Sequence, residues 1–253
     1  MDQTLGPVVV TGGGRGLGHS IASAFAAQGA SVALLDVQEG ASEVARALGD
    51  EHGVDAIGVD ADVTDPADLE SAFALVRERL GVPRILVTAA GITQLKDALE
   101  VSPDEWRRVM AVNVDGTFFA AQAFARGLLS TGASGSAVFI SSMSGSIVNV
   151  PQRQSAYNTS KAAVSHLAKS LAVEWADSGI RVNAIAPGYF LSDMTRQFTD
   201  ENPELARDWT SRIPLGRMGD PADLHGLALF LGSEASAYVT GQVLGIDGGY
   251  TAI

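Results

Sequence analysis

A tyrosine and a lysine four positions apart, Tyr157 and Lys161, are the residues of this sequence best placed to move a proton. They fall in a stretch with helical periodicity, so their side chains share one helix face. A free tyrosine has a pKa of about 10, and an adjacent ammonium lowers that pKa by favouring the phenolate. The pair therefore predicts a general acid/base. Taken alone, the same spacing also fits a partly exposed tyrosine beside a solvated lysine.

A serine-rich turn adds a second reactive group. Residues 141–145 read SSMSG and follow an expected strand over 136–141. Ligands in open α/β sheets bind at the carboxyl ends of strands. We expect Ser142 to donate a hydrogen bond there to a substrate oxygen on which negative charge develops. The alternative is a strand-end serine whose hydroxyl bonds only to the backbone.

A glycine-rich turn follows the first expected strand. Residues 11–18 read TGGGRGLG and include Gly12, Gly16 and Gly18. Glycine permits a tight turn and a close approach of the backbone to a pyrophosphate. The N-terminus of the following helix presents free N–H groups and a positive dipole end to the same anion. The turn predicts a dinucleotide-binding site, and a plain strand–helix turn is the alternative.

Asp36 ends the second expected strand, 18 residues after Gly18. A carboxylate at this position accepts hydrogen bonds from the adenosine ribose hydroxyls and repels a 2′-phosphate, which favours NAD over NADP. Arg15 lies inside the glycine turn, where it is able to contact such a phosphate, and it weakens the preference. An ordinary polar strand end is the alternative for Asp36. Asp62 and Val63 end the third expected strand and are candidates to hold the adenine.

Short β-branched runs alternate with longer helical patterns along the chain. This alternation predicts βαβ units, a parallel sheet covered by helices on both faces and right-handed crossovers. No linker, repeat or low-complexity tract divides the chain, so we expect one α/β domain over residues 1–253. The expected strands cover 8–11, 31–36, 56–59, 84–88, 136–141, 180–186 and 243–246, and the expected helices cover 17–28, 41–48, 66–80, 103–129 and 156–177.

Composition restricts the function classes. The 253 residues carry a formal net charge of −12, and 46% of them are hydrophobic, which is enough for a large core. An acidic surface repels phosphate backbones and anionic membranes, so neither is an expected partner. The chain has no cysteine, which excludes thiol catalysis and agrees with a reducing compartment. No stretch approaches the roughly 18 apolar residues that span a bilayer, and the N-terminus lacks secretory features, so we expect a cytoplasmic protein.

Residues 189–217 break the alternation of strands and helices. The segment is polar, contains Pro203 and Pro214, and shows no strand pattern. Long irregular inserts after a strand often close over a site, so we expect a substrate lid here. A pair of ordinary surface helices is the alternative. Trp209 is a candidate to line the lid, because aromatic side chains often line ligand pockets.

A metal site is not expected. The four histidines do not stand at ligand spacing. Residues 60–65 begin like a calcium loop but lack its glycine at the sixth position and its glutamate at the twelfth. We interpret Asp65 and Pro66 as the start of a helix instead.

The chain resembles the short-chain dehydrogenase/reductase family over essentially its whole length. Each motif is modest, and their joint order identifies the family. The resemblance rests on TGGGRGLG at residues 11–18, Asp62-Val63, Ala89-Ala90-Gly91, Asn113 in VNV, Ser142 in SSMSG, Tyr157 and Lys161 in YNTSK, Pro187-Gly188 and Asp247-Gly248-Gly249.

The resemblance implies a doubly wound, Rossmann-type sheet of seven parallel strands and hydride transfer between a nicotinamide dinucleotide and a hydroxyl or carbonyl group. In such a site Tyr157 is the general acid/base and Ser142 stabilises the reacting oxygen. Lys161 binds the nicotinamide ribose and tunes Tyr157, while Asn113 bends its helix and supports a proton-relay water. Cofactor contacts are expected from Gly12, Arg15, Gly16, Leu17, Gly18, Asp36, Asp62, Val63, Ala90, Gly91, Tyr157, Lys161, Pro187, Gly188, Phe190 and Ser192.

The family pattern also bears on assembly and is not matched everywhere. Members are usually tetramers or dimers joined through two long helices, here 103–129 and 156–177, and we expect a homotetramer. The usual Asn-Asn-Ala-Gly after the fourth strand reads Thr-Ala-Ala-Gly at residues 88–91, so the bracing of the central sheet must differ. The interval from Ser142 to Tyr157 is 15 residues, where 13 is commoner, which predicts a longer loop over the substrate.

Amides and hydroxyls fill the loop over residues 144–154. Such groups suit a polyhydroxylated ligand, because a buried donor left unpaired costs roughly 1–3 kcal/mol. The stretch is similar to polyol and sugar dehydrogenases of the family, so we expect NAD-dependent conversion of a small sugar alcohol or the matching ketose. Substrate contacts are expected from Ser144, Asn149, Gln154 and Tyr189.

Three alternatives remain. The first is reduction of a 3-oxoacyl thioester on an acyl carrier protein, for which such enzymes usually carry arginines near the second long helix to dock the acidic carrier. The position before Glu174 is Val173 rather than an arginine, and the whole chain is acidic, so both observations count against this alternative. Arg153 keeps an acidic sugar, such as a gluconate, among the possible substrates. A dinucleotide-sensing protein that lost catalysis is the non-enzyme alternative, and intact Ser142, Tyr157 and Lys161 argue against it.

Overall fold

Seven parallel strands form the centre of the fold in the computed structural model, which describes residues 5–192 and 199–253. Their order is β3-β2-β1-β4-β5-β6-β7, and every neighbouring pair is parallel. The chain changes direction across the sheet between β1 and β4, as in a doubly wound fold. The strands are β1 (Val8–Thr11), β2 (Val32–Asp36), β3 (Ala56–Asp60), β4 (Ile85–Thr88), β5 (Gly135–Ile140), β6 (Ile180–Pro187) and β7 (Val243–Ile246).

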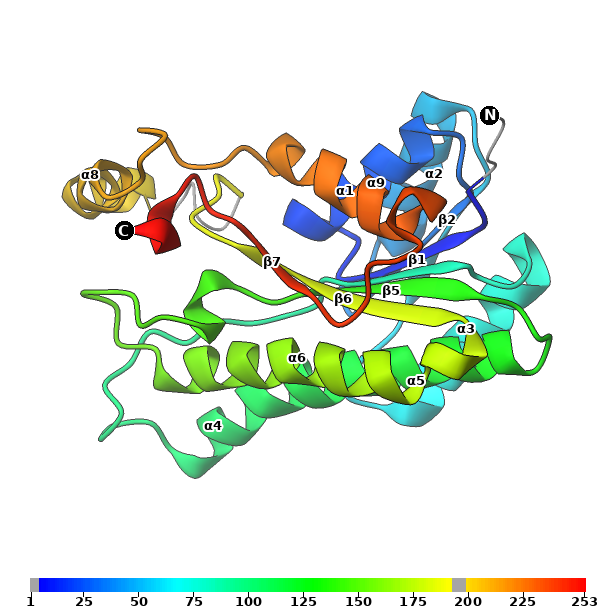
Figure 1. Ribbon diagram of the computed structural model, residues 1–253, viewed down its shortest axis with the longest axis horizontal. Coiled ribbons are helices and arrows are strands. Elements are labelled where there is room, and N and C mark those ends of the chain that lie inside the picture. Colours follow the sequence, from blue (N-terminus) through cyan, green and yellow to red (C-terminus); the bar gives the residue numbers. More distant parts are fainter. Residues whose placement is uncertain (1–4, 193–198) are drawn as a thin grey trace.

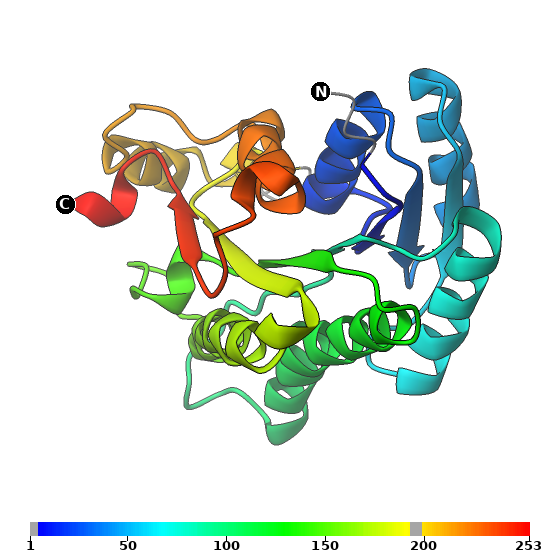
Figure 2. The same cartoon turned by 45° about the vertical axis from the view of Figure 1, so that its right-hand side comes forward.

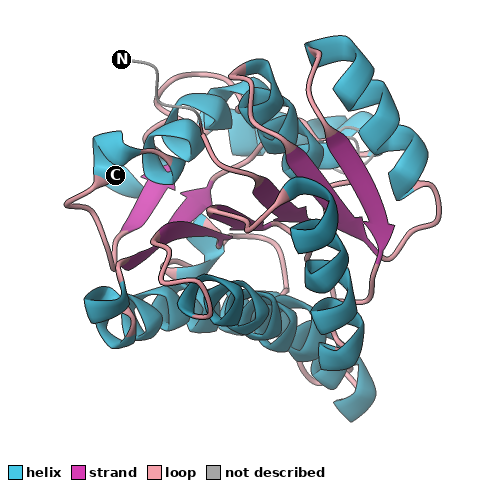
Figure 3. Ribbon diagram, turned by 90° about the vertical axis from the view of Figure 1, so that its right-hand side faces the viewer, coloured by secondary structure: helices cyan, strands magenta, loops and turns pink. Residues whose placement is uncertain are grey.

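Helices cover both faces of this sheet (Figures 1 and 3). They are α1 (Gly16–Ala27), α2 (Ala41–His52), α3 (Pro66–Leu80), α4 (Pro103–Met110), α5 (Gly116–Leu129), α6 (Ser155–Glu174), α8 (Pro203–Ser211) and α9 (His225–Gly232). α1, α2 and α9 pack on one face, and α3, α5 and α6 pack on the other. Figure 2 shows the blue α1 and orange α9 on the opposite side of the sheet from the green α5 and α6.

Burial follows the position of each strand in the sheet. Every residue of β1, β2 and β4 is buried, whereas β3 and β7, at the two edges, are only partly buried. Strands covered on both faces need apolar residues at every position, which explains runs such as VVV in β1. The continuous apolar runs of the sequence therefore mark the strands that hold the centre of the fold.

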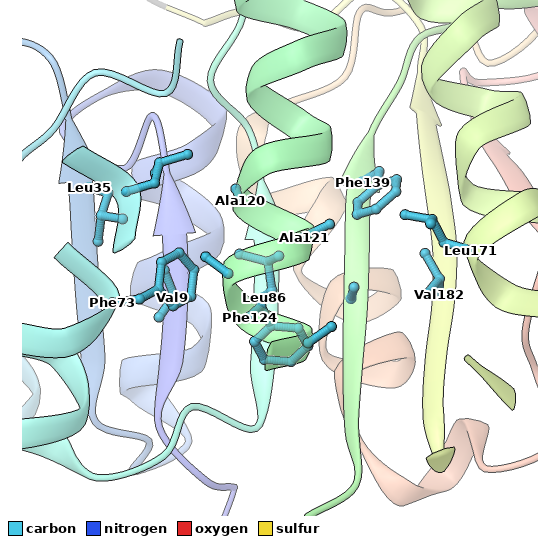
Figure 4. Close-up of a cluster of buried hydrophobic side chains, with 14 of the residues drawn as sticks. Val9, Leu35, Phe73, Leu86, Ala120, Ala121, Phe124, Phe139, Leu171 and Val182 are labelled. Atoms are coloured by element: carbon cyan, nitrogen blue, oxygen red, sulfur yellow. The ribbon is translucent and has the colours of Figure 1, made fainter. Parts of the chain in front are cut away.

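One core cluster fixes the helices that carry the chemical groups. Phe73 of α3 and Phe124 of α5 pack with Val9 of β1, while Phe139 of β5 lies near Leu171 of α6 (Figure 4). These side chains are at most 4% exposed. Burying each large apolar side chain contributes roughly 1.5–3 kcal/mol. This packing holds α5 and α6 against the sheet.

Local signals set the helix ends. Asp65 caps α3 by accepting hydrogen bonds from the N–H groups of Ala67 and Asp68, which confirms a helix start at this point. Ser102 and Glu105 form a capping box at α4. The helical stretch expected over 103–129 is interrupted by a π-helical turn, Ala111–Asp115, that contains Asn113. Asn113, where the family resemblance implies a bend, therefore lies within a locally widened turn of the helix.

Most expected elements are confirmed, with shifted ends. The α/β doubly wound sheet of seven strands is confirmed. β3 ends at Asp60, so Asp62 and Val63 lie in the turn after the strand rather than at its end. The second long helix ends at Glu174, and a short 3₁₀ turn follows it. Among the described residues, no helix is long and apolar enough to cross a membrane.

The segment expected to be a lid is only partly helical in the described residues. It contains α8, and Phe190 forms a parallel bridge with Gly219 at its base. Trp209 of α8 is 4% exposed and packs with Ile213 and Met218 in a small cluster of its own. Residues 193–198 lie outside the described residues. A lid over 189–217 stays a prediction.

The packing of α2 on β3 gives a test of the fold. A Cβ atom on Gly58 in β3 would overlap the carbonyl oxygen of Ala41, whereas one on Gly245 in β7 meets nothing within 4 Å. We expect Gly58→Ala to lower the free energy of unfolding by about 1–3 kcal/mol through overpacking. Gly245→Ala should change it by less than about 0.5 kcal/mol. Urea unfolding followed by circular dichroism measures both, and equal stabilities would contradict the close packing.

Candidate active site

The carboxyl ends of four neighbouring strands bring the predicted residues together. The glycine turn follows β1, Gly91 follows β4, Ser142 follows β5 and Gly188 follows β6. Because the strands are parallel, all four segments lie at one edge of the sheet. This edge includes the point between β1 and β4 where the strand order reverses, which is where ligands bind in open α/β sheets.

The glycine turn has the shape that a pyrophosphate requires. Gly12 and Gly16 adopt φ angles of +64° and +59°, which side chains rarely allow. A Cβ on Gly18 would overlap the carbonyl oxygen of Gly12. The helix α1 begins directly at Gly16, so its free N–H groups face the edge of the sheet. The turn therefore fits the phosphates of a dinucleotide. Leu17, in the first turn of α1, is partly buried, and Arg15 is exposed.

Asp36 lies where the sequence predicts, at the end of β2. It is 8% exposed, and its two carboxylate oxygens accept hydrogen bonds from the N–H groups of Gly14 (3.0 Å) and Gln38 (3.1 Å). The carboxylate is thus fixed beside the glycine turn. Asp62 accepts hydrogen bonds from the N–H and hydroxyl of Thr64, both at 2.8 Å, and Val63 is buried against Gly116.

Lys161 is the most constrained charged group of the site. Its side chain is 6% exposed, and its ammonium donates a hydrogen bond of 2.8 Å to the carbonyl oxygen of Ile140, the last residue of β5. The main-chain carbonyl of Lys161 accepts a hydrogen bond of 2.9 Å from the hydroxyl of Ser141. Burial lowers the pKa of Lys161 to about 8, because the charged form loses solvation.

Tyr157 and Lys161 share one face of α6, as their spacing predicts. The ammonium nitrogen lies 5.7 Å from the centre of the tyrosine ring. Burial raises the pKa of Tyr157, and a hydrogen bond with Ser142 opposes the rise. This direction is opposite to the one expected from the sequence. The physical reason is desolvation of the phenolate, which outweighs the opposing effect of Ser142.

Ser142 connects the tyrosine to the loop over the site. Its hydroxyl accepts a hydrogen bond of 3.1 Å from the N–H of Ser144 and caps the short 3₁₀ turn Met143–Gly145. Ser142 also lies close enough to Tyr157 to oppose the rise in the pKa of that tyrosine. A hydrogen bond from Ser142 to a substrate oxygen stays a prediction, because the bond shown for its hydroxyl is to the main chain.

Asn113 is fully buried and bonds to the segment after β4. Its amide accepts a hydrogen bond from the N–H of Ile92 (2.8 Å) and donates to the Ile92 carbonyl (3.0 Å) and to the Ser160 hydroxyl (2.9 Å). A Cβ on Gly91 would lie 3.3 Å from the Asn113 oxygen and 3.5 Å from the Lys161 ammonium. Asn113 and Lys161 thus meet at Gly91.

Two residues of the site were not singled out in the sequence. Ser160 lies three positions after Tyr157, so the same helical spacing that identifies Lys161 also places Ser160 close to this face. Gln152 lies in the loop before α6, and its amide donates a hydrogen bond of 2.7 Å to the hydroxyl of Tyr189. Only the polar character of that loop pointed to Gln152.

The expected substrate residues form one hydrogen-bonded network. The Ser144 hydroxyl donates to Asn149 (2.6 Å) and accepts from Gln154 (3.2 Å). Asn149 donates to the hydroxyl of Tyr189 at 3.2 Å. Tyr189 stacks on Trp209 with ring centres 4.4 Å apart. The structure therefore brings all four residues together and links them to α8.

The remaining predicted cofactor residues lie around the same edge. Gly188 follows Pro187, the last residue of β6, and a Cβ on it would lie 2.7 Å from the Cα of Asp247. Phe190 is buried in the core, where its ring packs on Gly219. Ser192 is the last described residue before the gap. Ala90 donates a long hydrogen bond of 3.4 Å from its N–H to Thr11.

The departure from the family pattern after β4 has a visible effect. The hydroxyl of Thr88 is buried and has no hydrogen-bond partner among the described residues. The asparagine usual at this position reaches further across the sheet than threonine, because its longer side chain ends in both a hydrogen-bond donor and an acceptor. The side-chain bracing that the family sequence pattern provides is therefore absent at Thr88.

A family profile described as enoyl-(acyl carrier protein) reductase matches residues 12–251. The chain is 48% identical to galactitol 2-dehydrogenase (L-tagatose-forming) from Cereibacter sphaeroides over 96% of this chain and 93% of that protein. The chain belongs to the short-chain dehydrogenase/reductase family. It is also 41% identical to sorbose reductase from Candida albicans and 40% identical to D-arabinitol 2-dehydrogenase from Candida tropicalis, over 96% of this chain and 85% and 91% of those proteins.

Solved structures agree with this membership. A short-chain type dehydrogenase/reductase from Mycobacterium marinum has a TM-score of 0.91 at 39% identity and covers 100% of this chain and 98% of its own. A gluconate 5-dehydrogenase from Burkholderia cenocepacia, in complex with NADP and tartrate, has a TM-score of 0.93 at 35% identity, with 99% and 96% coverage. This dehydrogenase is therefore an NAD(P)-dependent oxidoreductase that acts on CH–OH groups.

Within residues 5–192 and 199–253, no group of three or more histidine, aspartate or glutamate side chains is arranged to hold a metal ion. A nicotinamide dinucleotide supplies the hydride acceptor or donor when it is bound, and the glycine turn and Asp36 fit it. The residues of this chain then need only position the substrate and move a proton.

The tyrosine assignment predicts a selective loss of activity. We expect Tyr157→Phe to lower kcat for alcohol oxidation by about 100-fold or more, because general acid/base catalysis contributes about 10²–10⁴-fold. Tyr238→Phe, at a fully exposed tyrosine, should keep wild-type activity. Absorbance of the reduced dinucleotide at 340 nm measures both rates.

The same variants have a distinct pH signature. Oxidation requires the deprotonated phenol, and burial raises the pKa of Tyr157, so wild-type kcat should rise with pH into the alkaline range. The residual rate of Tyr157→Phe should lose this dependence. A Tyr157→Phe enzyme with wild-type kcat and an unchanged pH profile would remove Tyr157 from the proton transfer.

Proposed function

We propose that this dehydrogenase interconverts a small sugar alcohol and the corresponding ketose with NAD. The observation that carries the proposal is the 48% identity to a galactitol 2-dehydrogenase across 96% of the chain. The buried amide and hydroxyl network of Ser144, Asn149, Gln154 and Tyr189 supports it independently. Such groups satisfy the hydroxyls of a polyol and leave unpaired polar atoms when the ligand is apolar.

The residues divide the chemistry among them. In the oxidation direction the substrate hydroxyl gives its proton to the oxygen of Tyr157 as its carbon loses a hydride. Ser142, close enough to Tyr157 to lower its pKa, stabilises the substrate oxygen. Lys161 places a positive charge 5.7 Å from the tyrosine ring, and Asn113 anchors the segment after β4 that faces it. In the reduction direction Tyr157 returns the proton to the carbonyl oxygen.

The cofactor site is proposed along the strand ends. The glycine turn holds the pyrophosphate, and the Asp36 carboxylate accepts hydrogen bonds from the ribose hydroxyls. Asp62 and Val63 lie beside the adenine, and Pro187 and Gly188 line the nicotinamide. Further contacts come from Arg15, Leu17, Ala90, Gly91, Lys161 and the main chain of Phe190 and Ser192.

Assembly and location complete the proposal. We propose a homotetramer joined through α4, α5 and α6, which is the arrangement that the family resemblance implies. The long helices α5 and α6 lie side by side on the same face of the sheet (Figure 1). A cytoplasmic location agrees with the absence of cysteine from the sequence.

Reduction of a 3-oxoacyl thioester on an acyl carrier protein is the second candidate function, because the description of the matching family profile, enoyl-(acyl carrier protein) reductase, names the same kind of carrier. Val173, at the end of α6, is 82% exposed and apolar, so this position offers no basic group to an acidic carrier. The net charge of −12 also repels such a partner. The thioester therefore serves as the control substrate.

A substrate screen tests the proposal. We expect purified protein to reduce NAD at alkaline pH with one or more polyols of four to six carbons, followed at 340 nm. Acetoacetyl thioester with reduced dinucleotide should give no comparable rate. Thioester reduction without polyol oxidation would overturn the polyol assignment. Dinucleotide binding without any turnover, measured by calorimetry, would favour a sensing protein.

Asp36 gives a separate test of cofactor choice. Asp36→Asn removes the charge that repels a 2′-phosphate, so the ratio of kcat/KM with NADP to kcat/KM with NAD should rise by about tenfold or more. Asp60→Asn is the matched control, since Asp60 pairs with Asp36 in register at the end of β3 and is exposed. Initial rates with both dinucleotides measure the ratio. Equal ratios in the wild type and both variants would show that Asp36 does not select the cofactor.

A further inference from the structure

A hollow lies beside the substrate loop and is not explained by the chemistry above. It is an open hollow with a volume of about 510 Å³, lined by Lys96, Asp97 and Glu100 after β4, by Gln152 and Arg153 before α6, and by the apolar side chains of Leu95, Pro151 and Leu205, the last from α8. The two loops are joined by a hydrogen bond of 2.8 Å from the N–H of Lys96 to the carbonyl of Arg153.

A continuous set of hydrogen bonds connects this hollow with the reacting groups. Gln152 donates to Tyr189 at 2.7 Å, and Tyr189 also accepts from Asn149 at 3.2 Å. Asn149 accepts from the Ser144 hydroxyl at 2.6 Å, and the Ser144 N–H donates to Ser142 at 3.1 Å. The hollow is therefore the outward continuation of the proposed substrate site.

Both cations of the hollow are already paired with carboxylates. Arg153 forms an ion pair with Asp97. Lys96 donates to both oxygens of Glu105 at 2.9 Å, which lowers the pKa of Glu105 to about 2. Glu100 has no ion-pair partner in the part of the chain that the structure describes. The two cations thus face three carboxylates, and the hollow offers no uncompensated positive charge.

One buried acceptor beside the hollow lacks a donor. The side-chain oxygen of Gln152 is buried and has no hydrogen-bond partner among the described residues. A carbonyl oxygen only accepts hydrogen bonds, so a hydroxyl satisfies it and a carboxylate repels it. A buried acceptor left unsatisfied costs roughly 1–3 kcal/mol, which favours a ligand that supplies the missing donor.

We propose that the Asp97–Arg153 pair is a charge filter at the outer end of the substrate site, which admits the hydroxylated end of an uncharged polyol and rejects sugar acids. Asp97 is the specificity-determining residue, because it occupies the one cation of the substrate loop. This inference rests on the proposed function and adds the charge class of the substrate. Because Asp97 neutralises Arg153, this arginine does not provide a free positive charge for the carboxylate of a sugar acid.

The test compares one neutral and one acidic six-carbon ligand, galactitol and gluconate. Asp97→Asn keeps the side-chain oxygen that accepts from the N–H of Leu99 but removes the charge that neutralises Arg153. We expect the ratio of kcat/KM for gluconate to kcat/KM for galactitol to rise by about tenfold. The gain should shrink as ionic strength rises, since exposed charges are screened.

Two further variants isolate the effect. Asp97→Asn/Arg153→Gln should return the ratio to the wild-type value, because the freed cation is gone. Asp104→Asn breaks an exposed ion pair with Arg107 on α4 and should leave the ratio unchanged. Arg153 is 74% exposed, so loss of its ion pair should cost little stability, and thermal unfolding checks this.

Binding measurements distinguish a failure of the charge filter from a failure of the proposed function. Calorimetric affinities of gluconate and galactitol for the enzyme with bound dinucleotide give the same ratio without turnover. If the wild type oxidises neither compound but Asp97→Asn still raises the gluconate-to-galactitol binding ratio tenfold, the proposed function is rejected and the charge filter is kept. A ratio that stays within twofold in Asp97→Asn, or a wild type that prefers gluconate, overturns the filter.

Discussion

The buried ammonium of Lys161 is the constraint on which the site depends. A charge removed from water is costly, and this one is compensated by the carbonyl of Ile140 at the end of β5. The bond requires α6 to lie against that strand end, and the packing of Leu171 and Val164 on the sheet holds it there. Tyr157, one helical turn earlier, is then fixed beside Ser142. The position of one cation thus determines the geometry of the reacting groups.

Features that depend on local repeat geometry were predictable from the sequence. The helical period places Tyr157 and Lys161 on one face whatever the tertiary structure, and apolar runs such as residues 8–10 mark strands buried on both sides. The positive φ angles of Gly12 and Gly16 explain why the turn after β1 is glycine-rich. These parts of the fold and of the site follow from short stretches of chain.

Features that depend on contacts between distant segments were not predictable. The sequence indicated a lowered pKa for Tyr157, whereas burial raises it, and burial is a property of the assembled site. Gln152 and Tyr189 are 37 residues apart, and Asp97 and Arg153 are 56 apart, so nothing in their spacing indicates that they bond. Such pairs form only after the sheet has set the separation of the loops.

Bonds to main-chain atoms and bonds between side chains divide the site into a fixed inner part and an exchangeable outer part. Lys161 and Asn113 bond to the main-chain carbonyls of Ile140 and Ile92, which every residue type at those positions retains. Contacts of the outer part, such as the one between Gln152 and Tyr189, join side chain to side chain. Exchanging an outer side chain changes the ligand that fits without moving the reacting groups. In this chain the groups that react are thus set by the fold, and the side chains around the ligand vary independently of it.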